Sequence, residues 1–233
     1  MTRLLIDCGL PFKQLEERLV RRGVCLTDID AAFVTHEHSD HVGCARQLAQ
    51  QESIPILMSR GTYVAIGQPD MNHQLQLVSD GTDVTIKDLV VCPFTVAHDA
   101  KEPLQVMVTD GQIKFGLLTD LGHTTPYVAE CLISLDAIVI ECNHDPEMLR
   151  ASQYPSFLKQ RVAGNYGHLS NAQAADFLQI IAHPRLKHVV AAHLSLQNNH
   201  PKLAQKALAA VLNTAEGDIL VADATDGCDW LAI

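Results

Sequence analysis

Thr35-His36-Glu37-His38-Ser39-Asp40-His41 is the most informative segment of this chain. It places three imidazoles and a carboxylate within six consecutive residues, between an apolar run typical of a buried strand (29–34) and the beginning of a helix (42–49). His36 and His38 are two residues apart, so their side chains share one face of an extended segment. Imidazole suits zinc and iron, and carboxylate suits manganese and magnesium. We therefore expect a divalent metal site here, and a solvated histidine-rich loop is the weaker alternative.

The composition is that of a compact globular protein, because 47% of the 233 residues are hydrophobic and 19% are charged. We expect one domain over residues 1–233, no membrane-spanning segment and no signal peptide. The seven cysteines are odd in number and form no CxxC pair, which favours the reducing cytoplasm. The net charge of −10 argues against bulk attraction to nucleic acid, although it does not exclude nucleic acid as a substrate.

Apolar runs alternate with helical patterns in both halves of the chain, which suggests stacked sheets with helices outside. A helix is expected over 42–52, and Pro55 places the apolar strand 54–58 near a sheet edge. Asp80-Gly81 and Asp110-Gly111 lie between apolar stretches and predict two β-hairpins. Closing strands are expected at 219–222 and 228–231.

Three further positions repeat one layout, in which an apolar strand delivers a possible metal ligand at its end. These positions are His98, Asp120 and His193. The HxHxDH loop followed by these ligands resembles the metallo-β-lactamase-fold hydrolases over essentially the full chain. The resemblance implies a mixed α/β fold, a four-layer αββα sandwich. That fold usually begins with an extra strand pair, and this chain starts inside that region. Either the start site is misassigned, the chain is trimmed, or the protein lacks those strands.

Four shorter motifs narrow the resemblance to the bacterial branch often called YycJ or WalJ, which is described as 5′-to-3′ exonucleases or as uncharacterised hydrolases. Two of them also resemble elements of the tRNA 3′-processing endonucleases and of cyclic-phosphate phosphodiesterases. The motifs are Thr119-Asp120-Leu121-Gly122, Glu141-Cys142-Asn143-His144-Asp145-Pro146, Gly167-His168-Leu169-Ser170-Asn171 and His193-Leu194-Ser195 with Asn198-Asn199.

The family resemblance implies two divalent metal ions, zinc or manganese, held by five imidazoles and two carboxylates. It also implies that a hydroxide bridging the two ions attacks the substrate. The ligands implied are His36, His38 and His98 for the first ion, and Asp40, His41 and His193 for the second, with Asp120 bridging both.

His168 is the candidate general acid, because in the related phosphodiesterases the corresponding histidine protonates the leaving oxygen or binds the phosphate. A histidine that only caps the following helix is the alternative. Asp40 is a second catalytic candidate, as an acid/base partner of the hydroxide. Ser170, Asn171 and His144 are candidates for substrate binding, and for His144 a structural role in its loop is an equal alternative.

A metal-dependent phosphodiesterase, in the form of a 5′-to-3′ exonuclease, is therefore our first hypothesis. A thioester or lactone hydrolase of the glyoxalase II or lactonase type is the second, and those branches need no counterpart of His168. A non-catalytic binding protein is disfavoured because all seven ligand positions carry competent side chains. Few Lys and Arg residues cluster, so a nucleic-acid end or a small phosphodiester is as plausible as a long duplex. The sequence leaves the oligomeric state open, and a homodimer is one possibility.

Overall fold

The computed structural model describes residues 1–233, and the contacts within it divide the chain into two compact units. The first unit comprises residues 1–95 and 100–105, and the second comprises residues 96–99 and 106–233. The expectation of a single domain over 1–233 stays a prediction. None of the helices is long and apolar enough to cross a membrane.

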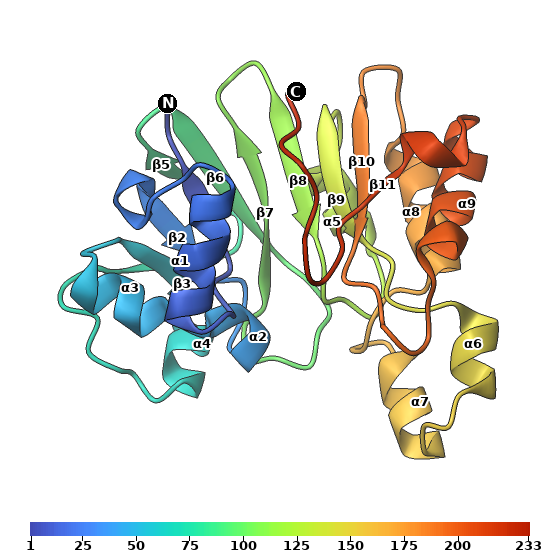
Figure 1. Cartoon of the computed structure of the whole chain (residues 1–233), viewed down its shortest axis with the longest axis horizontal. Helices are drawn as coiled ribbons and strands as arrows, with labels where there is room; N and C mark the ends of the chain where they lie inside the picture. The colour runs from blue at the N-terminus through green and yellow to red at the C-terminus, as the bar shows by residue number, and fades with distance from the viewer. The chain divides into compact units, whose positions relative to one another are not determined.

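The first unit contains a parallel sheet in the order β1-β2-β3-β4 and an antiparallel hairpin of β5 and β6 (Figure 1, blue to green). Its strands are β1 (Leu4–Ile6), β2 (Ala31–Phe33), β3 (Ile56–Ser59), β4 (Leu75–Val78), β5 (Val84–Ile86) and β6 (Leu89–Thr95). Its helices are α1 (Phe12–Arg21), α2 (Ser39–Val42), α3 (Ala45–Gln51) and α4 (Arg60–Ala65), with a 3-10 turn at Leu26–Asp28.

The core of this unit lies between the parallel sheet and the helices α1 and α3. Leu15 of α1 and Leu48 of α3 are buried in one cluster with Ile56 of β3. The continuous helix predicted over 42–52 is wrong, because α2 ends at Val42 and α3 begins at Ala45. Gly43, between the two helices, lies very close to the segment that follows β1. A Cβ atom added to Gly43 would lie 2.5 Å from the Cys8 carbonyl oxygen.

Two local predictions in this unit are corrected by the strand pairing. Pro55 precedes β3 instead of lying inside it, and β3 pairs with strands on both sides, so the strand is not at an edge. Asp80-Gly81 makes a turn but no hairpin, because β4 before it pairs with β3 whereas β5 after it pairs with β6. The dipeptide signals a reversal of the chain and cannot show which strands then pair.

The strands of the second unit lie in the order β11-β10-β9-β8-β7. They are β7 (Leu104–Thr109), which begins in the first unit's segment, β8 (Lys114–Leu118), β9 (Ala137–Glu141), β10 (His188–Ala192) and β11 (Leu220–Val221). The helices are α5 (Pro126–Cys131), α6 (Pro146–Ala151), α7 (Ser156–Val162), α8 (Asn171–Ile181) and α9 (Pro201–Leu212), with a 3-10 turn at Glu216–Asp218.

The strand predictions for this unit are confirmed with one exception. Asp110-Gly111 joins the antiparallel strands β7 and β8, as expected. The segment 219–222 contains β11, whereas 228–231 forms no strand and follows an isolated bridge between Asp223 and Gly227.

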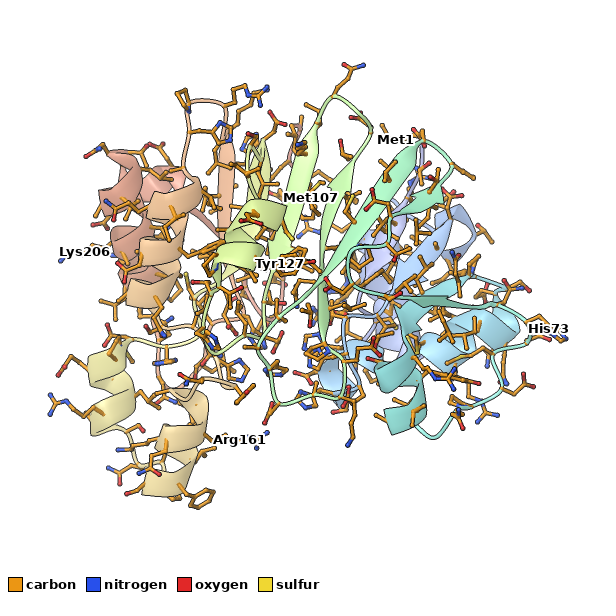
Figure 2. The ribbon with its side chains drawn as sticks, turned by 180° about the vertical axis from the view of Figure 1, so that it is seen from behind. Met1, His73, Met107, Tyr127, Arg161 and Lys206 are labelled. Carbon is orange, nitrogen blue, oxygen red and sulfur yellow. The ribbon has the colours of Figure 1, made fainter.

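Helices α8 and α9 pack against each other and against this sheet, α8 on β9 and α9 on β11 (Figure 1). Helix α9 begins with Pro201 at its first position, buries Ala204 and Leu208, and directs Lys206 outward (Figure 2). Because β8, β9 and β10 are parallel neighbours, their carboxyl ends meet at one edge of the sheet. This edge positions the site described next.

Candidate metal-binding and catalytic site

The HxHxDH loop of the first unit is held by Asp7, which follows β1. The Asp7 carboxylate accepts hydrogen bonds from the Thr35 N–H (2.8 Å) and the Thr35 hydroxyl (2.9 Å). The carboxylate also lies 2.7 Å from Nδ1 of His41, and this contact makes Nδ1 the nitrogen that carries the proton and donates it in a hydrogen bond. Nε2 of His41 is thereby left as the nitrogen able to bind a metal.

His36 and His38 point their ring nitrogens at one another, with Nε2 of His36 3.0 Å from Nδ1 of His38. The His36 ring is fully buried, and its centroid lies 4.0 Å from that of His41. The Asp40 side chain is 69% exposed, with one oxygen 3.7 Å from Nε2 of His41. Three imidazoles and a carboxylate are thus gathered at one end of this unit, as the spacing predicted.

Substitution of Asp7 by asparagine is expected to lower metal affinity about 10–100-fold, the usual effect of removing an outer partner of a ligand histidine. The amide keeps the size of the side chain but cannot accept from both Thr35 and His41. Titration of the metal-free protein with zinc measures the change. Asp70→Asn, at an exposed turn, is the matched control, and an unaltered affinity in Asp7→Asn would contradict the role given to Asp7.

In the second unit, the carboxyl ends of three parallel strands bring chemically active side chains together. Asp120 comes just after β8, Glu141 ends β9 and His193 comes just after β10. Oδ1 of Asp120 lies 3.6 Å from Nε2 of His193 and 3.7 Å from Nδ1 of His168. Each of these four residues offers a donor atom, and all four atoms lie within 4.8 Å of one another. We call Asp120, Glu141, His168 and His193 the strand-end cluster.

Glu141 organises the strand-end cluster. Its side chain is fully buried, and Oε1 accepts from Nδ1 of His193 (2.6 Å) and Nδ1 of His168 (2.9 Å). Oε2 accepts from the backbone N–H groups of Leu169 (2.9 Å) and Leu121 (3.3 Å). Burial opposes ionisation of this carboxyl, but the two imidazole hydrogen bonds outweigh it and lower its pKa to about 2.

The same contacts set the protonation of His168. Burial lowers the pKa of His168, but the hydrogen bond and the charge of Glu141 outweigh burial, and the pKa is raised overall. Nδ1–H of His168 donates to Glu141, so the second proton of the imidazolium lies on Nε2. The backbone requires glycine before it, because a Cβ on Gly167 would lie 2.2 Å from the Arg161 carbonyl oxygen.

Three residues of the site adopt a left-handed backbone conformation, with positive φ, that residues other than glycine rarely adopt. They are Asp7 (φ 59°) and His193 (φ 57°), which directly follow β1 and β10, and Asp120 (φ 55°), which lies two residues after the end of β8. This conformation is energetically unfavourable and persists only where the surrounding structure enforces it. Its recurrence at three strand ends indicates that these turns are maintained for the positions of their side chains.

His98 is 5% exposed, and its Nδ1 lies 3.3 Å from the Gly167 carbonyl oxygen. The donor bond from Nδ1 leaves Nε2 as the nitrogen able to bind a metal. The ring centroids of His98 and His168 are 5.5 Å apart. His98 therefore lies beside the strand-end cluster, within the same unit.

The candidate substrate-binding residues carry structural contacts. Ser170 caps α8 and shares a capping box with Gln173. Asn171 is buried, and its amide exchanges two 2.8 Å hydrogen bonds with the amide of Asn199. His144 is 2% exposed with no partner at Nδ1, and burial lowers its pKa. Their roles in substrate binding stay predictions.

Glu141 has no role among the residues predicted from the sequence, although the local signal that indicates Asp120 is also present at Glu141. Ala137-Ile138-Val139-Ile140-Glu141 is an apolar strand that ends in a carboxylate. Asn143 is a second functional-site residue without a sequence-based prediction. Its side-chain amide donates to the His193 carbonyl oxygen (3.1 Å) and supports the turn that carries this histidine.

Comparison with known proteins agrees with this architecture. Residues 2–193 match the family described as the β-lactamase superfamily domain. The chain is 34% identical over 213 residues to exodeoxyribonuclease YycJ of Bacillus anthracis, covering 90% of this chain and 81% of that protein. It is 32% identical over 220 residues to exodeoxyribonuclease WalJ of Streptococcus pneumoniae, covering 92% and 81%.

Solved structures of low sequence identity share the fold. The metallo-β-lactamase fold protein YhfI of Bacillus subtilis superposes with a TM-score of 0.73 at 16% identity, covering 98% of this chain and 87% of that one. The short form of human tRNase Z superposes with a TM-score of 0.60 at 20% identity, covering 82% and 81%. The predicted mixed α/β fold with two sheets, of the metallo-β-lactamase type, is confirmed.

Proposed function

The chain belongs to the β-lactamase superfamily and is a hydrolase, and from this premise we propose that it cleaves phosphodiester bonds as a 5′-to-3′ exonuclease. The observation that carries the proposal is the Glu141–His168 pair. Hydrolysis of a phosphodiester expels an alkoxide, and this leaving oxygen needs a proton that an imidazolium can donate. The two exodeoxyribonucleases to which the chain is similar support nucleic acid as the substrate.

The family implies divalent metal ions, and the donor chemistry of the residues fits them. Imidazole nitrogens whose opposite nitrogen is tied to a carboxylate or a carbonyl are typical of metal ligands, and His41, His98 and His193 all have this arrangement. Bound ions would make water acidic and stabilise negative charge on the phosphoryl group. The ligands would be His36, His38 and His98 for one ion, Asp40, His41 and His193 for the other, and Asp120 for both, with zinc or manganese as the metal.

The chain's own residues then divide the work of proton transfer and positioning. His168 donates the Nε2 proton to the leaving oxygen, and Glu141 keeps the imidazole protonated until then. The Glu141 carboxylate also orients His193, so one buried group positions both the proposed general acid, His168, and the proposed metal ligand, His193. Asp40, whose carboxylate is exposed to solvent, is suited to accept a proton from the attacking water.

We also infer that the protein works in the cytoplasm. All seven cysteines are free thiols, and Cys8, Cys44 and Cys142 are buried as small apolar side chains. A homodimer, which the sequence allows, stays a prediction.

The proposal is tested by measuring metal content and then turnover of bis-p-nitrophenyl phosphate, of 5′-end-labelled single-stranded DNA and of a thioester. We expect cleavage of both phosphodiesters, removal of nucleotides from the 5′ end, and loss of activity in EDTA that zinc or manganese restores. Hydrolysis of the thioester alone by the metal-replete protein would instead assign the site to the glyoxalase type.

A further inference from the structure

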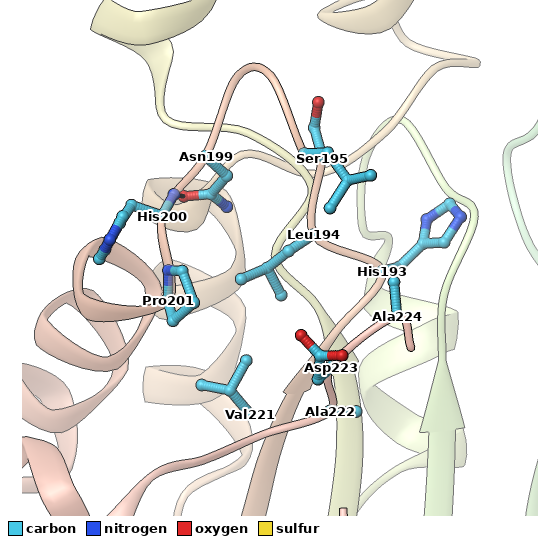
Figure 3. Close-up of a pocket in the computed structure, with 11 residues that line it drawn as sticks. His193, Leu194, Ser195, Asn199, His200, Pro201, Val221, Ala222, Asp223 and Ala224 are labelled. Carbon is cyan, nitrogen blue, oxygen red and sulfur yellow. Dashed lines mark hydrogen bonds between the residues drawn. The ribbon is translucent and has the colours of Figure 1, made fainter. Parts of the chain in front are cut away.

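A cavity of about 520 Å³ lies in the second unit directly beside the strand-end cluster (Figure 3). It is formed where the turn after β10 meets the beginning of α9 and the segment that follows β11. In Figure 3, His193 lies at one end of the hollow and Pro201 at the other, with Leu194 between them. The remaining lining residues are Ser195, Leu196, Asn199, His200, Val221, Ala222, Asp223 and Ala224.

The walls of this cavity suit an uncharged ring. Leu194, Pro201 and Val221 supply apolar surface, no Lys or Arg lines the cavity, and its carboxylate, Asp223, disfavours a phosphate away from the His193 end. The Asn199 amide is engaged with Asn171 and with the Cys142 carbonyl oxygen, so this wall is stiff and its polar groups are satisfied. Its volume falls in the range of about 300–1,000 Å³ that is typical of small-molecule sites.

The position of the cavity connects its occupant to the reacting centre. His193 forms part of the wall, and both of its ring nitrogens face the strand-end cluster, Nδ1 at 2.6 Å from Glu141 and Nε2 at 3.6 Å from Asp120. A ligand in the cavity that carries a phosphate at its His193 end therefore presents that phosphate to His193 and His168. Among biological phosphodiesters, a nucleotide has this form: a flat, neutral ring joined through a sugar to the phosphate.

The charge of the protein favours the same occupant. The chain has 17 Lys and Arg against 27 Asp and Glu, so its affinity for a polyanion cannot rest mainly on cations. Burial of a base against apolar side chains is an alternative source of affinity that tolerates any sequence, because every base has an apolar face. A strand end meets this requirement readily, since a terminal base has only one stacked neighbour to leave.

We propose that this cavity binds the base of the nucleotide whose phosphate is cleaved, which makes nucleoside phosphodiesters, and not small alkyl phosphodiesters, the substrate class. The inference rests on the proposed phosphodiesterase function and adds the residues that select the substrate. Leu194, Pro201 and Val221 hold the ring, and Leu196, 88% exposed, stands at the rim where the base enters.

Two substrates with the same leaving group separate this inference from the proposed function. They are the p-nitrophenyl ester of thymidine phosphate, tested as the 5′ and the 3′ isomer, and methyl p-nitrophenyl phosphate, which has no base. For the metal-replete wild-type protein we expect kcat/KM at least about tenfold higher for one thymidine ester, in line with the effect of one stacked base. Equal values would overturn the base cavity and leave the phosphodiesterase intact. Cleavage of none of the esters would overturn the phosphodiesterase itself.

Filling the cavity tests its location. Ala222→Phe places a ring inside the hollow, and Ala224→Trp, at an exposed position on the same wall, serves as the second variant if the first does not fold. Each is expected to lower the ratio of thymidine ester to methyl ester turnover at least about tenfold. Ala210→Phe, at an exposed position of α9 away from the cavity, is the matched control and keeps the wild-type ratio. A preference for the thymidine ester that survives in a folded, filled variant would place the base elsewhere.

Discussion

Replacement of Glu141 by glutamine is expected to lower phosphodiester turnover about a thousandfold, which combines an outer-partner effect of about 10–100-fold with part of the loss of a general acid. A glutamine amide has one oxygen to accept hydrogen bonds and an NH₂ group that can only donate. The NH₂ group would therefore face either the two imidazole donors or the two backbone N–H donors that Glu141 now accepts from, and those donors would lose their acceptor. Steady-state kinetics on 5′-end-labelled single-stranded DNA, whose alkoxide leaving group needs the proton, measures the loss.

The same substitution is expected to lower the free energy of unfolding by about 3–5 kcal/mol, the cost of removing one partner from a buried charged network. Urea denaturation of the metal-free protein measures it. Glu147→Gln is the matched control, because Glu147 is exposed and paired only with Arg150 on the surface of α6. Wild-type stability in Glu141→Gln would show that the buried carboxylate is not what holds the cluster.

The pH dependence of stability follows from the same carboxyl. The pKa of Glu141 is about 2 in the folded protein against an ordinary value of 4.5. Its ionised form therefore stabilises the fold above pH 4.5, and this contribution is lost as the pH falls toward 2. We expect the free energy of unfolding to fall more steeply below pH 4.5 in the wild type than in Glu141→Gln. Parallel curves would contradict the lowered pKa.

Substitution of His168 by alanine is expected to lower phosphodiester turnover by about 10²–10⁴-fold while metal content stays near that of the wild type. The reason is that His168 supplies a proton in the proposed mechanism and is absent from the proposed ligand set. Metal analysis of the purified variant, followed by kinetics, measures both quantities. Loss of metal would instead make His168 a ligand.

The pH profile separates proton donation by His168 from a merely structural role. Turnover should fall as the pH rises through the raised pKa of His168, because the protonated ring is the active form. In Glu141→Gln the partner that raises this pKa is gone, so the fall should occur at lower pH. His73→Ala, in an exposed loop of the first unit, is the control and should leave the profile unaltered.

Much of the site was predictable because metal-binding chemistry leaves a local pattern in the sequence. The HxHxDH loop and the apolar strands that precede Asp120 and His193 each indicate a candidate ligand through the residues next to it. The strand order, by contrast, could not be read from local signals. Pro55 and Asp80-Gly81 were both misassigned, since pairing partners lie far away in the sequence.

The sequence by itself determined the family of this protein, its candidate ligand residues and the histidine beside a helix start. Only the tertiary structure decided how these residues are connected. Three parallel strands end at one edge, and there Glu141 binds both His168 and His193, a relation between residues up to 52 positions apart. Periodicity and spacing describe each segment's own faces, whereas hydrogen bonds to a buried carboxylate depend on which segments the sheet brings together.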